Sequence, residues 1–330
     1  MALILSRTDI QRCLNMAEAI EAMRIAFGAL STGLAQAPQR MAVGLSEQGI
    51  ALLMPSLLQT SEQHAFGLKV VTVMPQNPLR NLPRIIASVL LLDATTGKTQ
   101  AILEGGWLTA MRTGAVSGLA TSLLARQDAD ILALFGAGVQ APMQVLAIHA
   151  VRPLQEVRVV NRNEEHYQQF VTHVQTLLGS RCPHISRASS AHEALSGTLL
   201  IACATTATTP LFDWSDVTPG AHINAIGAFT PEMCEVDAET LAHARIVVDE
   251  RESALVEAGD LLQALAGGRI SGAETWVELG DLVRGVQPGR QAADEVTFFK
   301  SVGIAVQDVA VASHIYMRAR ELGIGIEIDV

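Results

Sequence analysis

The feature that most constrains the fold of this chain is the segment ILALFGAGVQA, residues 131–141. Four of the five residues of Ile131–Phe135 are large and apolar, which is typical of a strand buried on both faces of a parallel sheet. It runs directly into Gly136-x-Gly138-x-x-Ala141, and a helical pattern of Val139, Met143 and Leu146 follows. Glycines at these positions allow a tight turn and let a pyrophosphate approach backbone N–H groups at the positive end of a helix. The segment predicts a Rossmann dinucleotide-binding domain; the alternative is a strand–helix turn that holds no ligand.

Composition and charge argue against several classes of function. At 330 residues the chain is long enough for two domains, and its formal charge of -10, without a basic run, argues against a nucleic-acid-binding surface. The longest apolar run, residues 85–92, is too short for a transmembrane helix, and the N-terminal residues lack the features of a signal peptide. The cysteines have no paired spacing and the histidines no metal-ligand spacing. We therefore expect a cytoplasmic protein with free thiols, no metal, no nucleic-acid partner and no membrane contact.

Residues 1–105 predict one helix followed by an antiparallel or mixed sheet. Asn15 with Glu18 three residues later is a capping box, and a helical apolar face runs from Ile20 to Leu30. A second helix is predicted at 108–124. Between the two helices, β-like runs occur at 40–45, 50–54, 66–73, 85–93 and 99–103.

The chain after residue 141 alternates between strand and helix patterns. A helix is predicted at 164–178 and lies among short apolar or β-branched runs, which indicates a parallel sheet with helices on both faces. The last helix, 305–321, lies beyond this pattern and is predicted to cross back to the first domain. The fold class is therefore α/β, with a Rossmann domain and a second α+β domain. The expected strands of the sheet after residue 141 are 157–160, 198–202, 222–226 and 246–248.

The residues after the second Rossmann strand indicate which dinucleotide is preferred. An acidic residue there accepts a hydrogen bond from the ribose 2′-hydroxyl of NAD, whereas an arginine pairs with the 2′-phosphate of NADP. Strand 157–160 runs into Asn161 and Arg162, and the first carboxylate is that of Glu164. The pattern predicts NADPH, with NADH as the alternative, unless Arg162 is a solvated loop residue. Thr205 follows a later strand and is predicted near the nicotinamide; the alternative is an ordinary polar loop.

Three basic residues outside this loop are candidates for chemistry. Lys69 lies inside the apolar run 66–73, where it points either to solvent or into a pocket. Arg112 lies in the predicted helix 108–124, and Arg40 begins a predicted strand. An arginine fork is the natural partner of a substrate carboxylate. The alternative for each arginine is an ordinary surface position.

Six ordered motifs are spread over nearly the whole chain. They are GLKVVTVMPQNP (67–78), LLDATTGKTQA (91–101), LTAMRTGAVSGLA (108–120), FGAGVQA (135–141), INAIGAFTPEMCEVD (223–237) and VGIAVQDVAVA (302–312). Together they resemble the ornithine cyclodeaminase/mu-crystallin family. The resemblance implies a Rossmann NAD(P)-binding domain at 113–304 and a split substrate-binding and dimerisation domain at 1–112, completed by 305–330. It also implies a homodimer.

The resemblance further implies roles for single residues. Lys69 matches the family's catalytic lysine, and Arg40 and Arg112 match the arginines that hold the substrate carboxylate. Thr113 matches a position close to the cofactor phosphates, and Asp308 matches one close to the nicotinamide. In the glycine turn, Gly138, Val139 and Gln140 match positions close to the cofactor phosphates, and the glycine motif itself adds Gly136 as a cofactor-binding residue.

One departure from the family pattern bears on the reaction. Ornithine cyclodeaminases carry a Gly-Asp-x-Pro loop whose aspartate handles the attacking amine, whereas this chain has Gly227-Ala-Phe229-Thr230-Pro231. A phenyl ring neither accepts a proton nor orients an amine. The loop resembles instead that of family members that reduce cyclic ketimines. In such an enzyme, Phe229 and Thr230 would contact the ring of the substrate.

We therefore predict NAD(P)H-dependent reduction of a cyclic imino acid. The substrates would be Δ1-pyrroline-2-carboxylate, giving L-proline, and its six-membered homologue, giving L-pipecolate. The alternatives are an ornithine cyclodeaminase, an alanine dehydrogenase, or a non-catalytic NADPH-binding protein of the mu-crystallin type.

Overall fold

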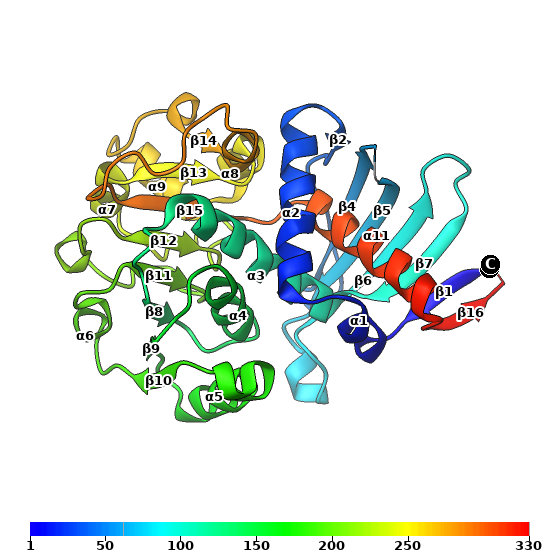
Figure 1. The fold of residues 1–330 in the computed structure, drawn as a ribbon, viewed down its shortest axis with the longest axis horizontal. Coiled ribbons are helices and arrows are strands. Elements are labelled where there is room, and N and C mark those ends of the chain that lie inside the picture. Colours follow the sequence, from blue (N-terminus) through cyan, green and yellow to red (C-terminus); the bar gives the residue numbers. More distant parts are fainter. Residues whose placement is uncertain (62, 330) are drawn as a thin grey trace. The chain divides into compact units, whose positions relative to one another are not determined.

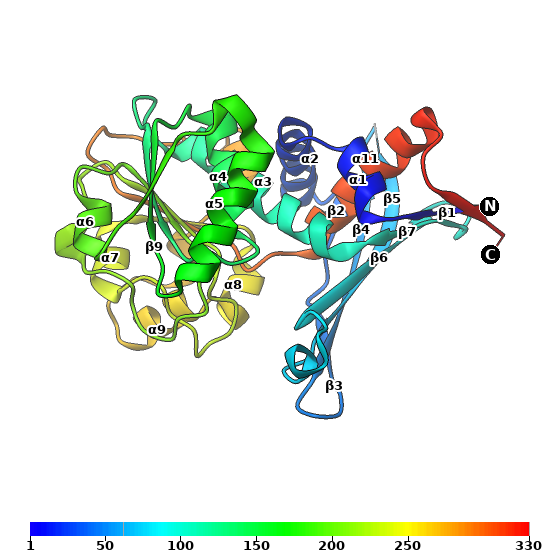
Figure 2. The same cartoon turned by 90° about the horizontal axis from the view of Figure 1, so that it is seen from below.

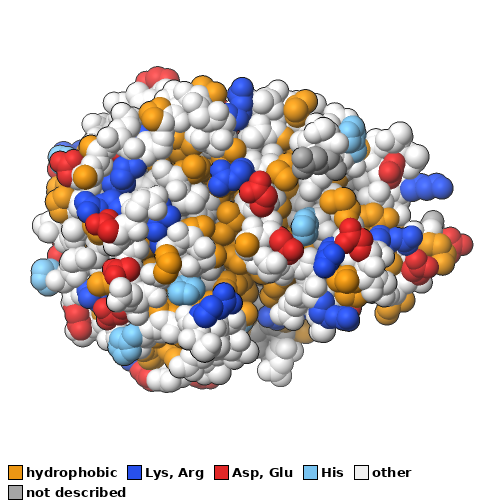
Figure 3. Space-filling view, viewed as in Figure 1, with side chains coloured by type: hydrophobic (Ala, Val, Ile, Leu, Met, Phe, Trp, Pro, Cys, Tyr) orange, Lys and Arg blue, Asp and Glu red, His pale blue; other side chains and the backbone are white. Residues whose placement is uncertain are grey.

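Two compact units make up the computed structural model, which describes residues 1–61 and 63–329 (Figures 1 and 2). The first unit consists of Met1–Arg112 and Ile304–Val330, and the second consists of Thr113–Gly303. The sequence places the second boundary one residue later, between 304 and 305. Among the described residues, no helix has the length and apolar character needed to cross a membrane. On the face drawn in Figure 3, acidic and basic side chains are interspersed and do not gather into one patch of either sign.

A mixed sheet forms the centre of the first unit. Its strands are β1 (Ala2–Leu5), β2 (Ala35–Gln36), β3 (Met41–Gly44), β4 (Ile50–Gln59), β5 (His64–Val73), β6 (Ile85–Asp93), β7 (Thr99–Glu104) and β16 (Ile326–Ile328). Their order is β16-β1-β7-β6-β5-β4-β2, with β3 also paired to β4. Strand β1 runs parallel to β7, and the other neighbours are antiparallel. Helix α11 (Ala305–Leu322) packs across β4, β5 and β6, and α2 (Met16–Ser31) packs against α11 (Figure 1).

Side-chain caps set the start of the first two helices. In α2 the Asn15 side chain accepts from the Glu18 N–H at 3.0 Å, and the Glu18 carboxylate accepts from the Asn15 N–H at 2.9 Å. The predicted capping box is thus confirmed. Ser6 and Asp9 form the same arrangement at α1 (Arg7–Cys13). Two donors at each helix start are satisfied by the chain itself.

A parallel sheet of eight strands forms the second unit. Its strands are β8 (Ile131–Phe135), β9 (Glu156–Val160), β10 (His184–Arg187), β11 (Leu200–Cys203), β12 (His222–Ala225), β13 (Arg245–Val248), β14 (Val277–Glu278) and β15 (Thr297–Lys300). All neighbours are parallel in the order β10-β9-β8-β11-β12-β15-β13-β14. The helices are α3 (Gly105–Leu124), which begins in the first unit, α4 (Ala141–Val151), α5 (Glu164–Leu178), α6 (Ala191–Leu195), α7 (Ala238–His243), α8 (Arg251–Glu257), α9 (Gly259–Ala266) and α10 (Leu279–Val283).

Helices cover both faces of this parallel sheet, as alternate residues of β8 show. Leu132 and Leu134 pack into the core cluster that includes α4 and α5, whereas Ala133 and Phe135 pack into a second cluster with α6, α8 and α9. Side chains at successive positions of a strand point to opposite faces, so both faces of the sheet are buried. The predicted α/β class with a Rossmann-type parallel sheet is confirmed.

Several predicted boundaries are wrong. The expectation of one helix before the sheet in 1–105 fails because β1 and α1 come first. Arg40 lies just before β3 and does not belong to it. Val139 does not lie on the helix face, because α4 begins at Ala141 and the Val139 side chain is 80% exposed. Strands β10, β14 and β15 of the parallel sheet were not predicted from the sequence.

Candidate active site

Lys69 points to the buried face of β5. This face is formed by Ala65, Gly67 and Lys69, and it lies against α11. A Cβ at Gly67 would lie 2.9 Å from a side-chain carbon of Val309, so the absence of a side chain there lets the helix approach the strand. Only 2% of Lys69 is exposed. Of the two orientations that the sequence allows, the structure has the buried one.

A buried cluster joins Lys69 to α11 and α3. The Lys69 ammonium donates to Asp308 Oδ2 at 2.7 Å, and Arg112 Nε donates to Asp308 Oδ1 at 3.1 Å. Asp308 is fully buried and lies in the first turn of α11, where the positive end of the helix favours a carboxylate. The structure thus brings together three of the predicted site residues within the first unit. The predicted contact between Asp308 and the nicotinamide stays a prediction.

The cluster carries more positive than negative charge. Burial, and then the charge of Arg112, lower the pKa of Lys69 to about 7, although Asp308 opposes the shift. Arg40 also lowers the pKa of Lys69, so its charge acts on this site. Two or three cations around one carboxylate favour the binding of an anionic group. A lysine that titrates near neutrality can donate a proton there.

Gln307 is a member of the cluster that sequence reasoning missed. Its Oε1 accepts from Arg112 Nη1 at 2.5 Å. This contact leaves Nε2 as a buried donor, for which no hydrogen-bond partner is found among the described residues. A buried donor without a partner costs free energy unless a ligand supplies the acceptor. In the sequence, the one indication that Gln307 belongs to the site is its position next to Asp308 in the Val-Gln-Asp segment.

The glycine turn after β8 fits the pyrophosphate of a dinucleotide. Gly136 has a φ of 97°, and a Cβ there would lie 2.6 Å from the Ala204 carbonyl oxygen. A Cβ at Gly138 would meet nothing within 4 Å, so the backbone there is open to a ligand. No side chain caps α4 at Gln140, in contrast to the capped α5. Ala141 and Met143 donate their N–H groups to the Gly138 and Gln140 carbonyl oxygens, and Pro142 has no N–H, so a pyrophosphate would approach the backbone of residues 138–140 at the positive end of α4.

Three other predicted cofactor residues also belong to the second unit. Thr113 is the first residue of the second unit and is buried. Its backbone carbonyl oxygen accepts a hydrogen bond from Gln144 Nε2 at 3.3 Å. Asn161 Nδ2 donates to the Asn163 carbonyl oxygen at 2.7 Å, and Arg162 is exposed between them. These contacts define where the side chains lie; their roles toward the cofactor stay predictions.

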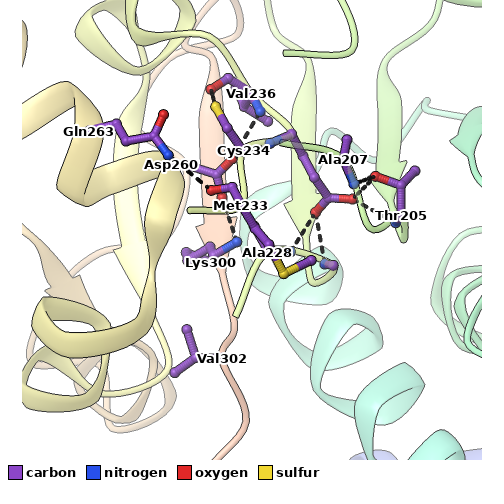
Figure 4. A network of polar contacts seen from close by, with 12 residues as sticks. Thr205, Ala207, Ala228, Met233, Cys234, Val236, Asp260, Gln263, Lys300 and Val302 are labelled. Atoms are coloured by element: carbon purple, nitrogen blue, oxygen red, sulfur yellow. Dashed lines mark hydrogen bonds and ion pairs between the residues drawn. The ribbon is translucent and has the colours of Figure 1, made fainter. Parts of the chain in front are cut away.

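The loops after β11 and β12 meet at a buried glutamate that the sequence did not single out. Thr205, of the first loop, donates to Glu235 through its N–H and its hydroxyl (Figure 4). In the second loop, Phe229 is 39% exposed and Thr230 follows it. Glu235 carries no distinct sequence signal, since it is one of several acids in the segment 230–237. Within the described ranges, no group of three or more potential metal ligands comes together.

Similarity to known proteins extends over nearly the whole chain. The model of the ornithine cyclodeaminase/mu-crystallin family matches residues 1–323. A Δ1-pyrroline-2-carboxylate reductase of Bacillus cereus is 39% identical over 329 residues, which are 99% of each chain. The structure of Thermococcus litoralis Δ1-pyrroline-2-carboxylate reductase in complex with NADH and L-proline has a TM-score of 0.92 and 36% identity, covering 99% of this chain and 100% of that one. An archaeal alanine dehydrogenase dimer with bound NAD has a TM-score of 0.91 and 33% identity, covering 99% of both chains. This chain therefore belongs to the ornithine cyclodeaminase/mu-crystallin family.

Proposed function

We propose that this protein is an NAD(P)H-dependent reductase of cyclic ketimines. It converts Δ1-pyrroline-2-carboxylate to L-proline and the six-membered Δ1-piperideine-2-carboxylate to L-pipecolate. The observation that carries the proposal is the buried cluster, in which a lysine with a pKa of about 7 and an arginine share Asp308. A cyclic imino acid presents the two groups that such a cluster recognises, a carboxylate and a basic imine nitrogen. The relatives from Bacillus cereus and Thermococcus litoralis are named Δ1-pyrroline-2-carboxylate reductases, after the first of these two substrates.

The side chains of the cluster divide the reaction between them. Arg112, with Arg40, holds the substrate carboxylate by charge and hydrogen bonds. The Lys69 ammonium donates a proton to the ring nitrogen, and Asp308 holds the ammonium in place through the 2.7 Å contact. A reduced nicotinamide cofactor, held at the glycine turn of Gly136 and Gly138, would supply a hydride to the C=N carbon. One hydride and one proton convert the imine into a secondary amine, so Lys69 ends the step neutral and regains a proton from solvent.

The loop after β12 supports reduction over ring closure. Phe229 occupies the place where cyclodeaminases carry an aspartate, and a phenyl ring offers a flat apolar contact to a substrate ring. We assign this contact to Phe229, with Thr230 as the neighbouring polar contact. A cyclodeaminase would need an acid–base group at this position.

Absorbance of the reduced cofactor tests the function directly. NADPH or NADH is mixed with each imine near neutral pH, and ammonia is measured in parallel with L-ornithine and NAD⁺. Rapid oxidation with an imine, without ammonia from ornithine, is expected. Ammonia and proline from ornithine would establish a cyclodeaminase, and faster oxidation with pyruvate and ammonia would establish an alanine dehydrogenase. Cofactor binding without any turnover would establish a binding protein of the mu-crystallin type.

The loop after β9 supports NADPH as the preferred cofactor. Arg162 is exposed, while the Glu164 carboxylate, the nearest acid, is paired with Arg187. Arg187 also donates to the Asn161 carbonyl oxygen at 2.8 Å. Glu164 is therefore engaged by an arginine, which leaves Arg162 to bind a 2′-phosphate.

Replacing Arg162 with Ala should raise KM for NADPH about tenfold, since a charge-assisted hydrogen bond contributes about 1.5–3 kcal/mol. KM for NADH should stay within about threefold, because NADH lacks the 2′-phosphate. Arg181→Ala, on another exposed arginine of the second unit, is the control. Equal changes in both KM values would contradict the assignment.

Exposed apolar side chains on the first unit support a homodimer. They are Met41 and Val43 of β3, Leu79 and Leu82 in and after the 3₁₀ helix Asn77–Arg80, and Ile85 and Ile86 of β6. Large apolar side chains exposed in this number on one unit are typical of a protein–protein interface. The archaeal relative was solved as a dimer.

Sedimentation should give twice the 35.1 kDa of one chain, and the double substitution Met41→Glu with Ile85→Glu should give monomers. A wild-type monomer would contradict the proposal.

We also place the enzyme in the cytoplasm. All four cysteines are free thiols, and three of them are buried. Free thiols are usual in a reducing compartment.

A further inference from the structure

Glu235 is a buried carboxylate whose two oxygens accept four hydrogen bonds. Oε1 accepts from the Thr205 N–H at 2.7 Å and from its hydroxyl at 2.9 Å. Oε2 accepts from the N–H groups of Gly227 at 2.8 Å and Ala228 at 3.1 Å (Figure 4). The side chain is fully buried, and burial raises the pKa of Glu235 although Lys300 and Thr205 oppose the shift. All four partner groups donate to the carboxylate, so each of its two oxygens accepts two hydrogen bonds.

The four hydrogen bonds join two different loops. Thr205 follows β11, whereas Gly227 and Ala228 follow β12, which is the parallel neighbour of β11. A Cβ at Gly227 would lie 2.2 Å from the Thr205 carbonyl oxygen, so the loops touch here through their backbones. In a doubly wound sheet, ligands bind at the carboxyl ends of the strands, which is where these loops begin. Phe229 directly follows the segment that Glu235 holds.

Two further buried charges hold Glu235 itself. Asp260 Oδ1 accepts from the N–H groups of Glu235 at 2.5 Å and Val236 at 3.0 Å. Lys300 of β15 donates to Asp260 Oδ2 at 2.5 Å, and both side chains are fully buried. The backbone of Glu235 is thereby tied to a third strand of the sheet. We call Glu235 with Thr205, Gly227, Ala228, Asp260 and Lys300 the Glu235 network.

We propose that Glu235 is a positioning residue for the reduction. By holding both loops, it keeps Thr205 and Phe229 at a fixed separation, so that the cofactor contact and the substrate contact assigned to them occur together. Burying a carboxylate is costly, and apolar side chains would suffice if the loops needed only packing. Four hydrogen bonds to three backbone N–H groups and one hydroxyl instead fix the direction of each loop. The inference rests on the proposed function.

Glu235→Gln tests the role, because an amide has one acceptor where the two loops need two. The NH₂ group of the amide must then face the N–H groups of one of the two loops. Because both groups are donors, no hydrogen bond forms between them, and that loop shifts. A misplacement of about 1 Å can cost about 100-fold in rate, so kcat/KM for the imine should fall at least about 30-fold. The dissociation constant of NADPH should stay within about threefold, because the pyrophosphate and ribose contacts assigned above come from the loops after β8 and β9.

A second variant perturbs the same contact without changing a charge. Gly227→Ala places a methyl group against Thr205 and Glu235 and should also lower kcat/KM with little effect on NADPH affinity. Val174→Ala, a buried position in α5 outside the Glu235 network, controls for loss of stability alone. It should lower Tm and leave both constants within about threefold.

The outcomes separate the two proposals. Imine turnover by the wild type, with both variants within threefold of it, would overturn the positioning role and leave the proposed function intact. A wild type without imine turnover would overturn the proposed function. Hydrogen exchange at the amides of Gly227 and Ala228 then still tests the network, because Glu235→Gln should speed their exchange relative to Val174→Ala. Unchanged exchange would overturn the positioning role in that case also.

Discussion

Lys69→Met is expected to lower kcat/KM for the cyclic imine about a thousandfold, since a positioned general acid contributes about 10²–10⁴-fold. Methionine fills a similar volume but has no proton to donate. The substitution should leave the fold intact, because it removes a charge that burial disfavours, and Asp308 keeps its contact with Arg112. The measurements are steady-state rates with both imines, together with Tm.

In the wild-type enzyme, kcat/KM for the imine should depend on pH through the titration of Lys69. The pKa of Lys69 is lowered to about 7, by burial first and by Arg112 second. Only the protonated amine donates, so kcat/KM should be level below this pKa and fall about tenfold per pH unit above it. Bound substrate adds a carboxylate near the ammonium, so the fall in kcat should begin at higher pH than the fall in kcat/KM. Lys69→Arg, whose guanidinium does not titrate in this range, should lose the fall.

Lys98→Met is the matched control, since it makes the same change on an exposed lysine of the same unit. It should leave the rate and the pH profile unchanged. A Lys69→Met enzyme within tenfold of wild type would rule out Lys69 as the proton donor, whatever the behaviour of the control.

Features that depend on neighbours in the sequence were predicted well. The Asn15–Glu18 capping box, helix 164–178 and strand 85–93 agree with the structure residue for residue. Each depends on short-range spacing or on one continuous periodic run. The glycine turn at 136–138 also has the predicted strand before it and the predicted helix after it.

Features that depend on distant partners were not determined by the sequence pattern. Apolar residues occupy both faces of β5, so alternation could not decide which way Lys69 points. The residue that decides it, Asp308, lies 239 positions away along the chain. Glu235 is a similar case, since its burial depends on Asp260 and Lys300, which come from other elements. Short strands such as β1 were missed because four apolar residues carry no clear period.

Arg112→Met is the second substitution with a large expected effect, and it tests substrate binding in place of proton transfer. Arg112 donates through Nε to Asp308 and through Nη1 to Gln307, which orients the guanidinium. We assign the remaining nitrogen of the guanidinium, Nη2, to the substrate carboxylate. Arg112 is buried, so the loss of its charge-assisted hydrogen bond should lie near the upper end of about 1.5–3 kcal/mol and raise KM for the imine about 100-fold. Arg112→Lys keeps the charge without the planar fork and should raise KM about tenfold.

A shift of the pH profile distinguishes this role from a merely structural one. Arg112 is one of the groups that lower the pKa of Lys69, so its removal should raise that pKa and move the fall in kcat/KM to higher pH. Arg112→Lys, which keeps a cation, should leave the fall near its wild-type position. Lys69 remains as the partner of Asp308 in both variants, so the carboxylate is never left alone. If Arg112→Met leaves KM and the pH profile as in wild type, the substrate carboxylate must be held elsewhere, and Arg40 becomes the residue that binds it.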